Sequence, residues 1–138
     1  MTDRPANEER GEITLDLGEK YVMRPSYEAI SAFESAIDKG LFDIASDAIN
    51  HRLRLNETAI IATECIKAWG RATGASITVQ AFKPQRIAEM ILESEGGYKA
   101  ALEQVAMMLA MACTGGYTAT GEAKAATVTT MIEDTGAA

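Results

Sequence analysis

The sequence predicts a mostly α-helical (α+β) protein, in which an N-terminal β-hairpin packs on a small bundle of four to five helices and a mobile C-terminal tail follows. Its 138 residues suffice for about one compact domain, and 47% hydrophobic residues with only 3 Pro provide a core. Aromatic residues supply just 6% of the chain, so slim aliphatic side chains that suit packed helices dominate. Apolar residues alternate with period two near the N-terminus and later recur every three or four residues.

The hairpin is the first expected element. Apolar and polar residues alternate from Ile13 to Leu17, and a second alternating run begins at Tyr21. Gly18-Glu19 lies between the two runs and predicts a tight, type II′-like turn. Because an isolated hairpin is marginally stable, its apolar face is expected to pack on the helices that follow.

Two helices are expected after the hairpin. Ser26 is a good N-cap for the first, and Lys39 followed by Gly40 predicts its end. A second short amphipathic segment begins at Leu41 and ends near His51, where a cation would interact favourably with the helix dipole.

The remaining helices are bracketed by caps and helix breakers. Asn56 is the expected cap of a third helix, Pro84 opens a fourth, and Gly96-Gly97 separates the fourth from a last helix. Trp69 and Leu102 are expected in the core. Segment 77–82 fits a short strand and a buried connector equally well.

These elements predict three parts of the chain. Residues 1–10 are polar and charged and are expected to form a flexible N-terminus. Residues 11–113 form a single hairpin-plus-helices domain. Residues 114–138 are rich in Thr, Ala and Gly and are expected to form a flexible tail.

Charge and hydropathy argue against several classes of partner. Thirteen basic and 20 acidic residues give a formal net charge of −7, which disfavours nucleic acid. The longest apolar segment, residues 100–113, is shorter than a membrane span. The N-terminus lacks the pattern of a signal peptide, and Cys65 and Cys113 are far apart, so two reduced thiols in the cytoplasm are expected.

No catalytic motif is recognisable. The chain contains no phosphate-binding loop, dinucleotide fingerprint, HExxH or GxSxG motif. Asp43, Asp47 and His51 follow helical spacing and could supply three metal ligands, but acidic residues at this spacing usually form the solvated face of a helix. We therefore expect no catalytic residue, no metal site and no cofactor.

The last helix is apolar nearly all round. Such a helix is either the innermost helix of a bundle or one that a partner covers, and methionine side chains adapt readily to different partners. Both alternatives fit the sequence, and self-association is a further possibility. The candidate partner-binding residues are Met90, Leu102, Met107, Met108 and Met111.

The order of N-terminal features is similar to a known signature. The run GEITLDLGEKYVMRPSYEAISAFESAIDKGLFDIA resembles the start of the tail assembly chaperones of bacteriophages, prophages and gene transfer agents. The matching pieces are the hairpin around Gly18-Glu19, the strand-to-helix switch at residues 24–28, the Phe33-Glu34 position and the Gly40-Leu41 turn. The likeness covers residues 11–72 well and 84–113 loosely.

The resemblance implies a non-enzymatic role in building a long flexible tail. Such chaperones hold the tape measure protein, whose apolar helices would otherwise aggregate, while tail tube subunits assemble around it. The implied partners are therefore the tape measure and tail tube proteins. The implied place of action is the cytoplasm of the bacterial host, with few or no copies in the mature particle. Some members are instead described as tail tube proteins, which makes a structural tube or connector subunit the alternative.

Overall fold

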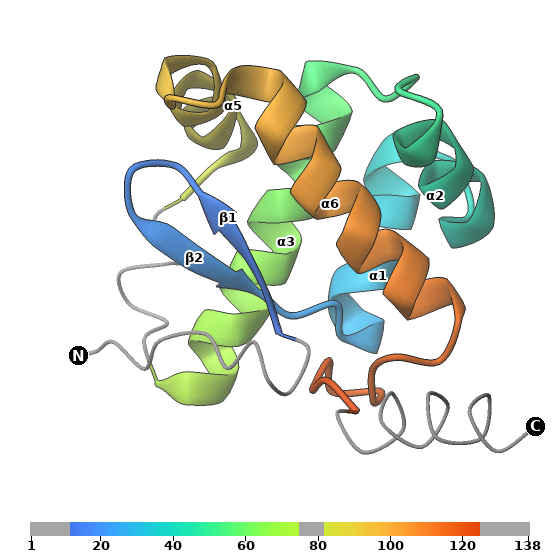
Figure 1. The fold of residues 1–138 in the computed structure, drawn as a ribbon. Coiled ribbons are helices and arrows are strands. Elements are labelled where there is room, and N and C mark those ends of the chain that lie inside the picture. The colour runs from blue at the N-terminus through green and yellow to red at the C-terminus, as the bar shows by residue number, and fades with distance from the viewer. Residues whose placement is uncertain (1–11, 75–81, 125–138) are drawn as a thin grey trace, which may run out of the picture.

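The computed structural model describes residues 12–74 and 82–124, which form a two-stranded hairpin followed by five helices (Figure 1). This confirms the predicted fold class. The expectations for residues 1–10, for most of segment 77–82 and for the end of the chain lie outside the described residues. The elements are β1 (Ile13–Asp16), β2 (Lys20–Met23), α1 (Tyr27–Ile37), α2 (Leu41–Ile49), α3 (Leu55–Thr73), α5 (Pro84–Glu93) and α6 (Gly97–Cys113).

Helix α3 is the centre of the domain. It packs against α1, α5, α6 and β2, and nine of its residues are buried. Helix α6 crosses in front of α3, with the hairpin on one side and α2 on the other (Figure 1). The largest fully buried side chains are Phe33, Leu15, Met23, Ile44, Ile61, Ile66, Ile87, Ile91, Met108, Leu109 and Val105.

The hairpin turn is one residue longer than predicted. Asp16 pairs with Lys20, so residues 17–19 form the loop, and the carboxylate of Asp16 accepts the Gly18 amide at 3.0 Å. Gly18 has φ +100, which a glycine adopts at little cost. The additional loop residue is Leu17, whose side chain is buried in the core.

Helix α1 begins as predicted and ends earlier. The Ser26 hydroxyl accepts the Ala29 amide at 3.1 Å, which confirms the N-cap. The helix stops at Asp38, which adopts the left-handed conformation with φ 64. Gly40 instead precedes α2 in an extended conformation, and the Glu34 carboxylate accepts the Leu41 amide at 2.7 Å.

A left-handed residue also ends α2. His51 has φ 58, and the following Arg52 amide donates to the Asp47 carbonyl at 2.7 Å. His51 is exposed, and its left-handed backbone conformation ends the helix.

Replacing His51 by glycine is expected to raise the free energy of unfolding by about 0.5–1 kcal/mol, because glycine adopts this conformation without a Cβ clash. His51→Ala keeps the clash and is expected to give no increase. Urea denaturation of both variants measures the difference, and equal stabilities would contradict the explanation.

A tyrosine joins the start of α6 to the start of α3. The Tyr98 hydroxyl donates to the Leu53 carbonyl and lies 3.0 Å from the Thr58 hydroxyl, which in turn donates to the Arg54 carbonyl at 3.1 Å. Partial burial raises the pKa of Tyr98, so its hydroxyl stays protonated at neutral pH.

Tyr98→Phe is expected to lower the free energy of unfolding by about 1–3 kcal/mol, because it leaves the Leu53 carbonyl without this donor. Thermal or urea denaturation measures the loss. Tyr27→Phe is the matched control, since the Tyr27 side chain is exposed, and it is expected to have no effect. Equal losses in the two variants would contradict the role assigned to Tyr98.

The domain was predicted to end at residue 113, but in the structure it continues to residue 124. Residues 114–124, here called the C-terminal strap, fold back on the domain and bury Tyr117, Gly121 and Ala123. The Ala119 carbonyl accepts the Tyr27 amide at 2.8 Å, a donor at the start of α1 that would otherwise lack an acceptor within the helix. The sequence did not predict this tertiary contact because residues 114–124 contain few apolar residues.

Segment 77–82 is described only at its end. The Phe82 ring lies edge-on to the Tyr21 ring, with the ring centroids 5.3 Å apart. This contact joins the start of α5 to β2.

Candidate partner-binding surface

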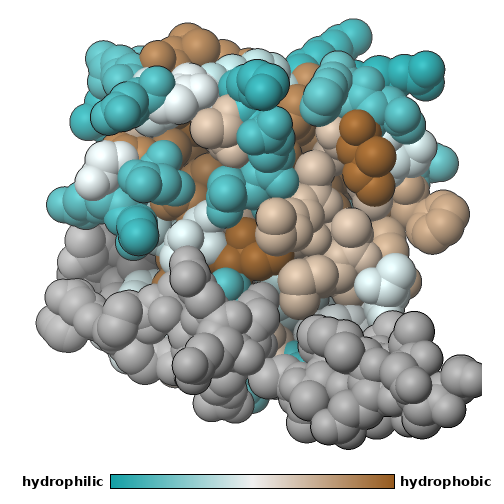
Figure 2. Space-filling view, in the orientation of Figure 1, coloured by the Kyte–Doolittle hydropathy of each residue, from teal (hydrophilic) through white to brown (hydrophobic). Residues whose placement is uncertain are grey.

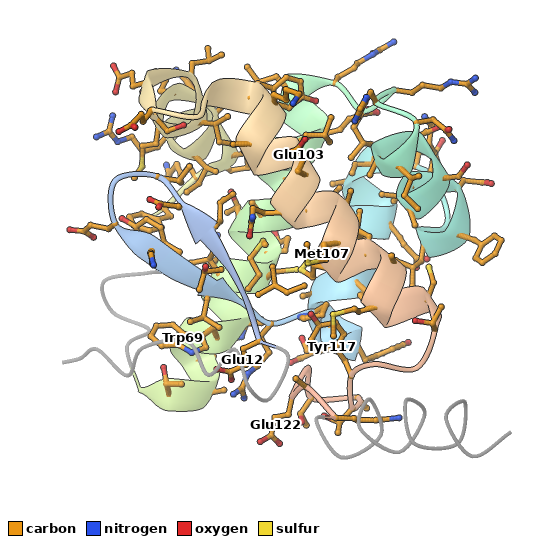
Figure 3. The ribbon with its side chains drawn as sticks, viewed as in Figure 1. Glu12, Trp69, Glu103, Met107, Tyr117 and Glu122 are labelled. Atoms are coloured by element: carbon orange, nitrogen blue, oxygen red, sulfur yellow. The ribbon has the colours of Figure 1, made fainter. Side chains whose placement is uncertain are left out.

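The outward face of α6 changes character along its length. In the first half, Lys99 and Glu103 form an exposed ion pair at 3.4 Å. In the second half, Met107 is 55% exposed, and Ala106 and Ala110 beside it are half-buried. Figure 3 shows Glu103 and Met107 on the same side of α6. The second half of α6 therefore presents apolar side chains on its outer as well as its inner side.

Helix α2 contributes two further exposed apolar side chains. Phe42 is 78% exposed and Ile49 is 57% exposed. The two are seven residues apart and therefore lie on the same side of α2. Helices α2 and α6 pack directly on each other, so the exposed apolar side chains of the two helices lie on neighbouring elements. In Figure 2, apolar side chains gather over the C-terminal half of α6 and beside it over α2.

We call this region the α2–α6 apolar face and define it as Phe42, Ile49, Ala106, Met107 and Ala110. Hydrophobic patches on the surface of a soluble domain are typical of protein–protein interaction sites. The three large side chains differ in shape and stiffness, and methionine is the most adaptable of them.

The five predicted partner-binding residues separate into three groups. Met107 lies on the α2–α6 apolar face. Met108 and Leu102 are buried, so their assignment to a partner-binding surface is corrected to the core. Met90 and Met111 are partly buried and pack against the core. Consecutive positions on a helix point about 100° apart, which is why Met107 and Met108 differ so strongly.

The amphipathic pattern that begins at Leu41 did not predict the exposure of Phe42 and Ile49. A signal was available: six of the nine residues of α2 are apolar, while only Ile44, Ala45 and Ala48 are buried. An apolar sector wider than the core contact leaves side chains exposed.

The three candidate metal ligands do not surround a common site. Asp47 binds Lys39 at 2.9 Å, Asp43 is exposed, and His51 lies beyond the end of α2. Within residues 12–74 and 82–124, no group of three His, Cys, Asp or Glu side chains is arranged to hold a metal ion. The hydrogen bond to Asp47 raises the pKa of Lys39, an effect that solvent screens at this exposed site.

Both cysteines are free thiols. Cys65 is buried in α3, and burial raises the pKa of its thiol far above neutral pH. Burial also raises the pKa of the partly exposed Cys113 thiol. Both sulfurs are therefore protonated at neutral pH, which makes them poor nucleophiles.

A polar groove of about 740 Å³ lies between the hairpin turn and the turn before α6. Its charged side chains are Asp16 and Lys20 from the hairpin and Glu95 from the α5–α6 turn. The other lining residues are small or uncharged, namely Thr14, Gly18, Gly96, Ala100, Ala101 and Gln104. The groove is open and mixed in charge, in contrast to the α2–α6 apolar face.

No described helix combines the length and the apolar character needed to cross a membrane. No protein-family model, curated protein or solved structure matches the chain.

Proposed function

We propose that this protein is a non-enzymatic tail assembly chaperone of a phage or gene transfer agent. It acts in the cytoplasm of the bacterial host and binds the tape measure protein, the tail tube protein or both during tail morphogenesis. The observation that carries the proposal is the α2–α6 apolar face, together with the resemblance of residues 11–72 to that family.

The chemistry of the proposed function is burial of apolar surface. A tape measure protein of the kind implied by the resemblance has long apolar helices, and each helix needs its apolar stripe covered until the tube forms around it. Phe42, Ile49 and Met107 offer such a helix exposed apolar side chains from two packed helices. Removing apolar area from water contributes roughly 25 cal/mol per Å², so a small face gives a reversible contact that the tube can displace.

The net charge supports the same role. At −7 the chaperone repels other copies of itself, which opposes aggregation while its apolar residues are exposed. The proposal assigns no residue to catalysis and requires no cofactor.

Co-expression with the matching tape measure protein tests the proposal. We expect the chaperone to increase the soluble yield of the tape measure protein and to co-purify with it. An unchanged soluble yield without co-purification would contradict the proposal. Mass spectrometry of purified particles tests the alternative, because abundant copies in mature particles indicate a structural tube or connector subunit.

A further inference from the structure

The C-terminal strap is a small self-contained unit. Within it, the Thr118 amide donates to the Glu122 carbonyl at 2.8 Å and the Lys124 amide donates to the Gly116 carbonyl at 2.9 Å. Tyr117 and Ala123 form an antiparallel bridge between its two arms. Its backbone is therefore paired mainly with itself.

Few backbone hydrogen bonds hold the strap to the rest of the domain, although the side chains of Tyr117 and Ala123 are buried in the core cluster. Among the described residues, one backbone hydrogen bond, from the Tyr27 amide to the Ala119 carbonyl, joins it to an element distant in sequence. The other main attachment is Tyr117, which is buried, with its hydroxyl 3.9 Å from the Met111 sulfur. A peripheral segment with few backbone hydrogen bonds to the rest of a domain opens more readily than the central helices.

The strap packs tightly against the rest of the domain at Gly121. This residue has φ +87, and a Cβ atom there would lie 2.4 Å from Arg24 Cγ and 2.8 Å from the Ser26 amide nitrogen. The strap backbone thus lies directly on the junction between β2 and α1. Any side chain at position 121 would disfavour the closed strap.

The strap covers the continuation of the α2–α6 apolar face. Met111 follows Met107 by four residues and lies on the same side of α6. The Met111 side chain is partly buried beneath Gly116 and Tyr117, whereas the Met107 side chain is open to solvent. Tyr117 lies beside the C-terminal half of α6 in Figure 3.

We propose that residues 114–124 detach from the domain and lose their internal hydrogen bonds in a single step while the rest of the domain stays folded, and that this opening uncovers Met111 and lengthens the α2–α6 apolar face by one helical turn. The strap is then an autoinhibitory contact that limits the apolar surface of the free protein. Its regulatory meaning rests on the proposed chaperone function, whereas the opening itself is a property of the isolated chain.

Native-state hydrogen exchange measured by NMR on the full chain tests the opening. The Tyr27 amide reports the closed strap because its acceptor is Ala119, whereas the Ile30 amide in the same helix donates to Ser26. We expect Tyr27, Gly121 and Lys124 to share one opening equilibrium and to be at least about 100-fold less protected than the buried part of α3. Ile30 is expected to be better protected than Tyr27.

Two glycine variants make the test specific. Gly121→Ala strains the closed strap, so it is expected to accelerate exchange at Tyr27 and Lys124 by about 10- to 100-fold. Gly74→Ala is the matched control, because Gly74 has a similar φ of +84 but open space around it. It destabilises the folded domain without favouring strap opening, so exchange at Tyr27 is expected to be unchanged. Ala123→Ser, which buries a hydroxyl only in the closed strap, is a milder variant with the same expected direction.

Equal protection of Tyr27 and the α3 core would overturn the proposal, since the strap would then open only on global unfolding. Different protection at Tyr27, Gly121 and Lys124 would also overturn it, because the segment would fray piece by piece. Neither result depends on a tape measure protein. If the tape measure protein does not co-purify but the strap opens cooperatively, only the chaperone function is rejected.

Discussion

Met108→Ala is expected to lower the free energy of unfolding by about 2–5 kcal/mol, the range of large-to-small substitutions in a packed core. Met108 has no exposed surface, and it lies in the same cluster as Val105 and Leu109 of α6. Truncation removes its apolar contacts and leaves a cavity that the surrounding helices fill only in part. Urea denaturation with an unchanged m-value measures the loss.

Met107→Ala is the matched control, because it makes the same chemical change one position earlier in the same helix. The Met107 side chain is mostly exposed, so a change within about 0.5 kcal/mol is expected. Similar losses in the two variants would show that the inward and outward sides of α6 are assigned incorrectly.

The double variant Phe42→Glu/Met107→Glu is expected to reduce capture of the tape measure protein at least about 30-fold, which corresponds to about 2 kcal/mol of binding free energy. Each substitution places a carboxylate in an apolar contact, where its loss of hydration has no compensating partner. Co-purification yield and a direct binding titration measure the effect. Both wild-type side chains are exposed, so the fold itself is expected to remain stable.

Leu92→Glu is the control for this prediction. Leu92 is also a large exposed apolar residue, but it belongs to α5 rather than to the α2–α6 apolar face. Wild-type capture by Leu92→Glu together with loss in the double variant would locate the binding surface. Loss in all variants would indicate a charge effect, which Phe42→Lys/Met107→Lys then tests with the opposite sign.

Different residues are expected to control folding stability and partner binding. Met108 and Tyr98 act on folding, through a packed core and a hydrogen bond between α6 and the start of α3. Substitutions of Phe42 and Met107 are expected to affect partner binding and to leave the core intact. A variant that loses capture without losing stability supports the chaperone proposal most directly.

Local signals in the sequence determined much of the fold. The Ser26 cap, Pro84 at the start of α5 and the break before α6 lie where short-range chemistry placed them. Such signals succeed because a cap or a proline acts on backbone groups within one helical turn. The hairpin was predicted for the same reason, although its turn is one residue longer and includes the buried Leu17.

Tertiary structure decided the rest. Asp38 and His51 end their helices in left-handed conformations that the predicted helix ends did not include, and the strap depends on a hydrogen bond between Tyr27 and Ala119, which are far apart in the sequence. The sequence by itself determined that α6 is apolar nearly all round and that α2 carries more apolar residues than polar ones. Only the packing of α6 between α2 and the hairpin determined that Met108 is buried and that Met107 and Phe42 are exposed. The physical reason is that the helical period fixes the angular separation of side chains around one helix, whereas the neighbouring elements decide which side of that helix faces the core.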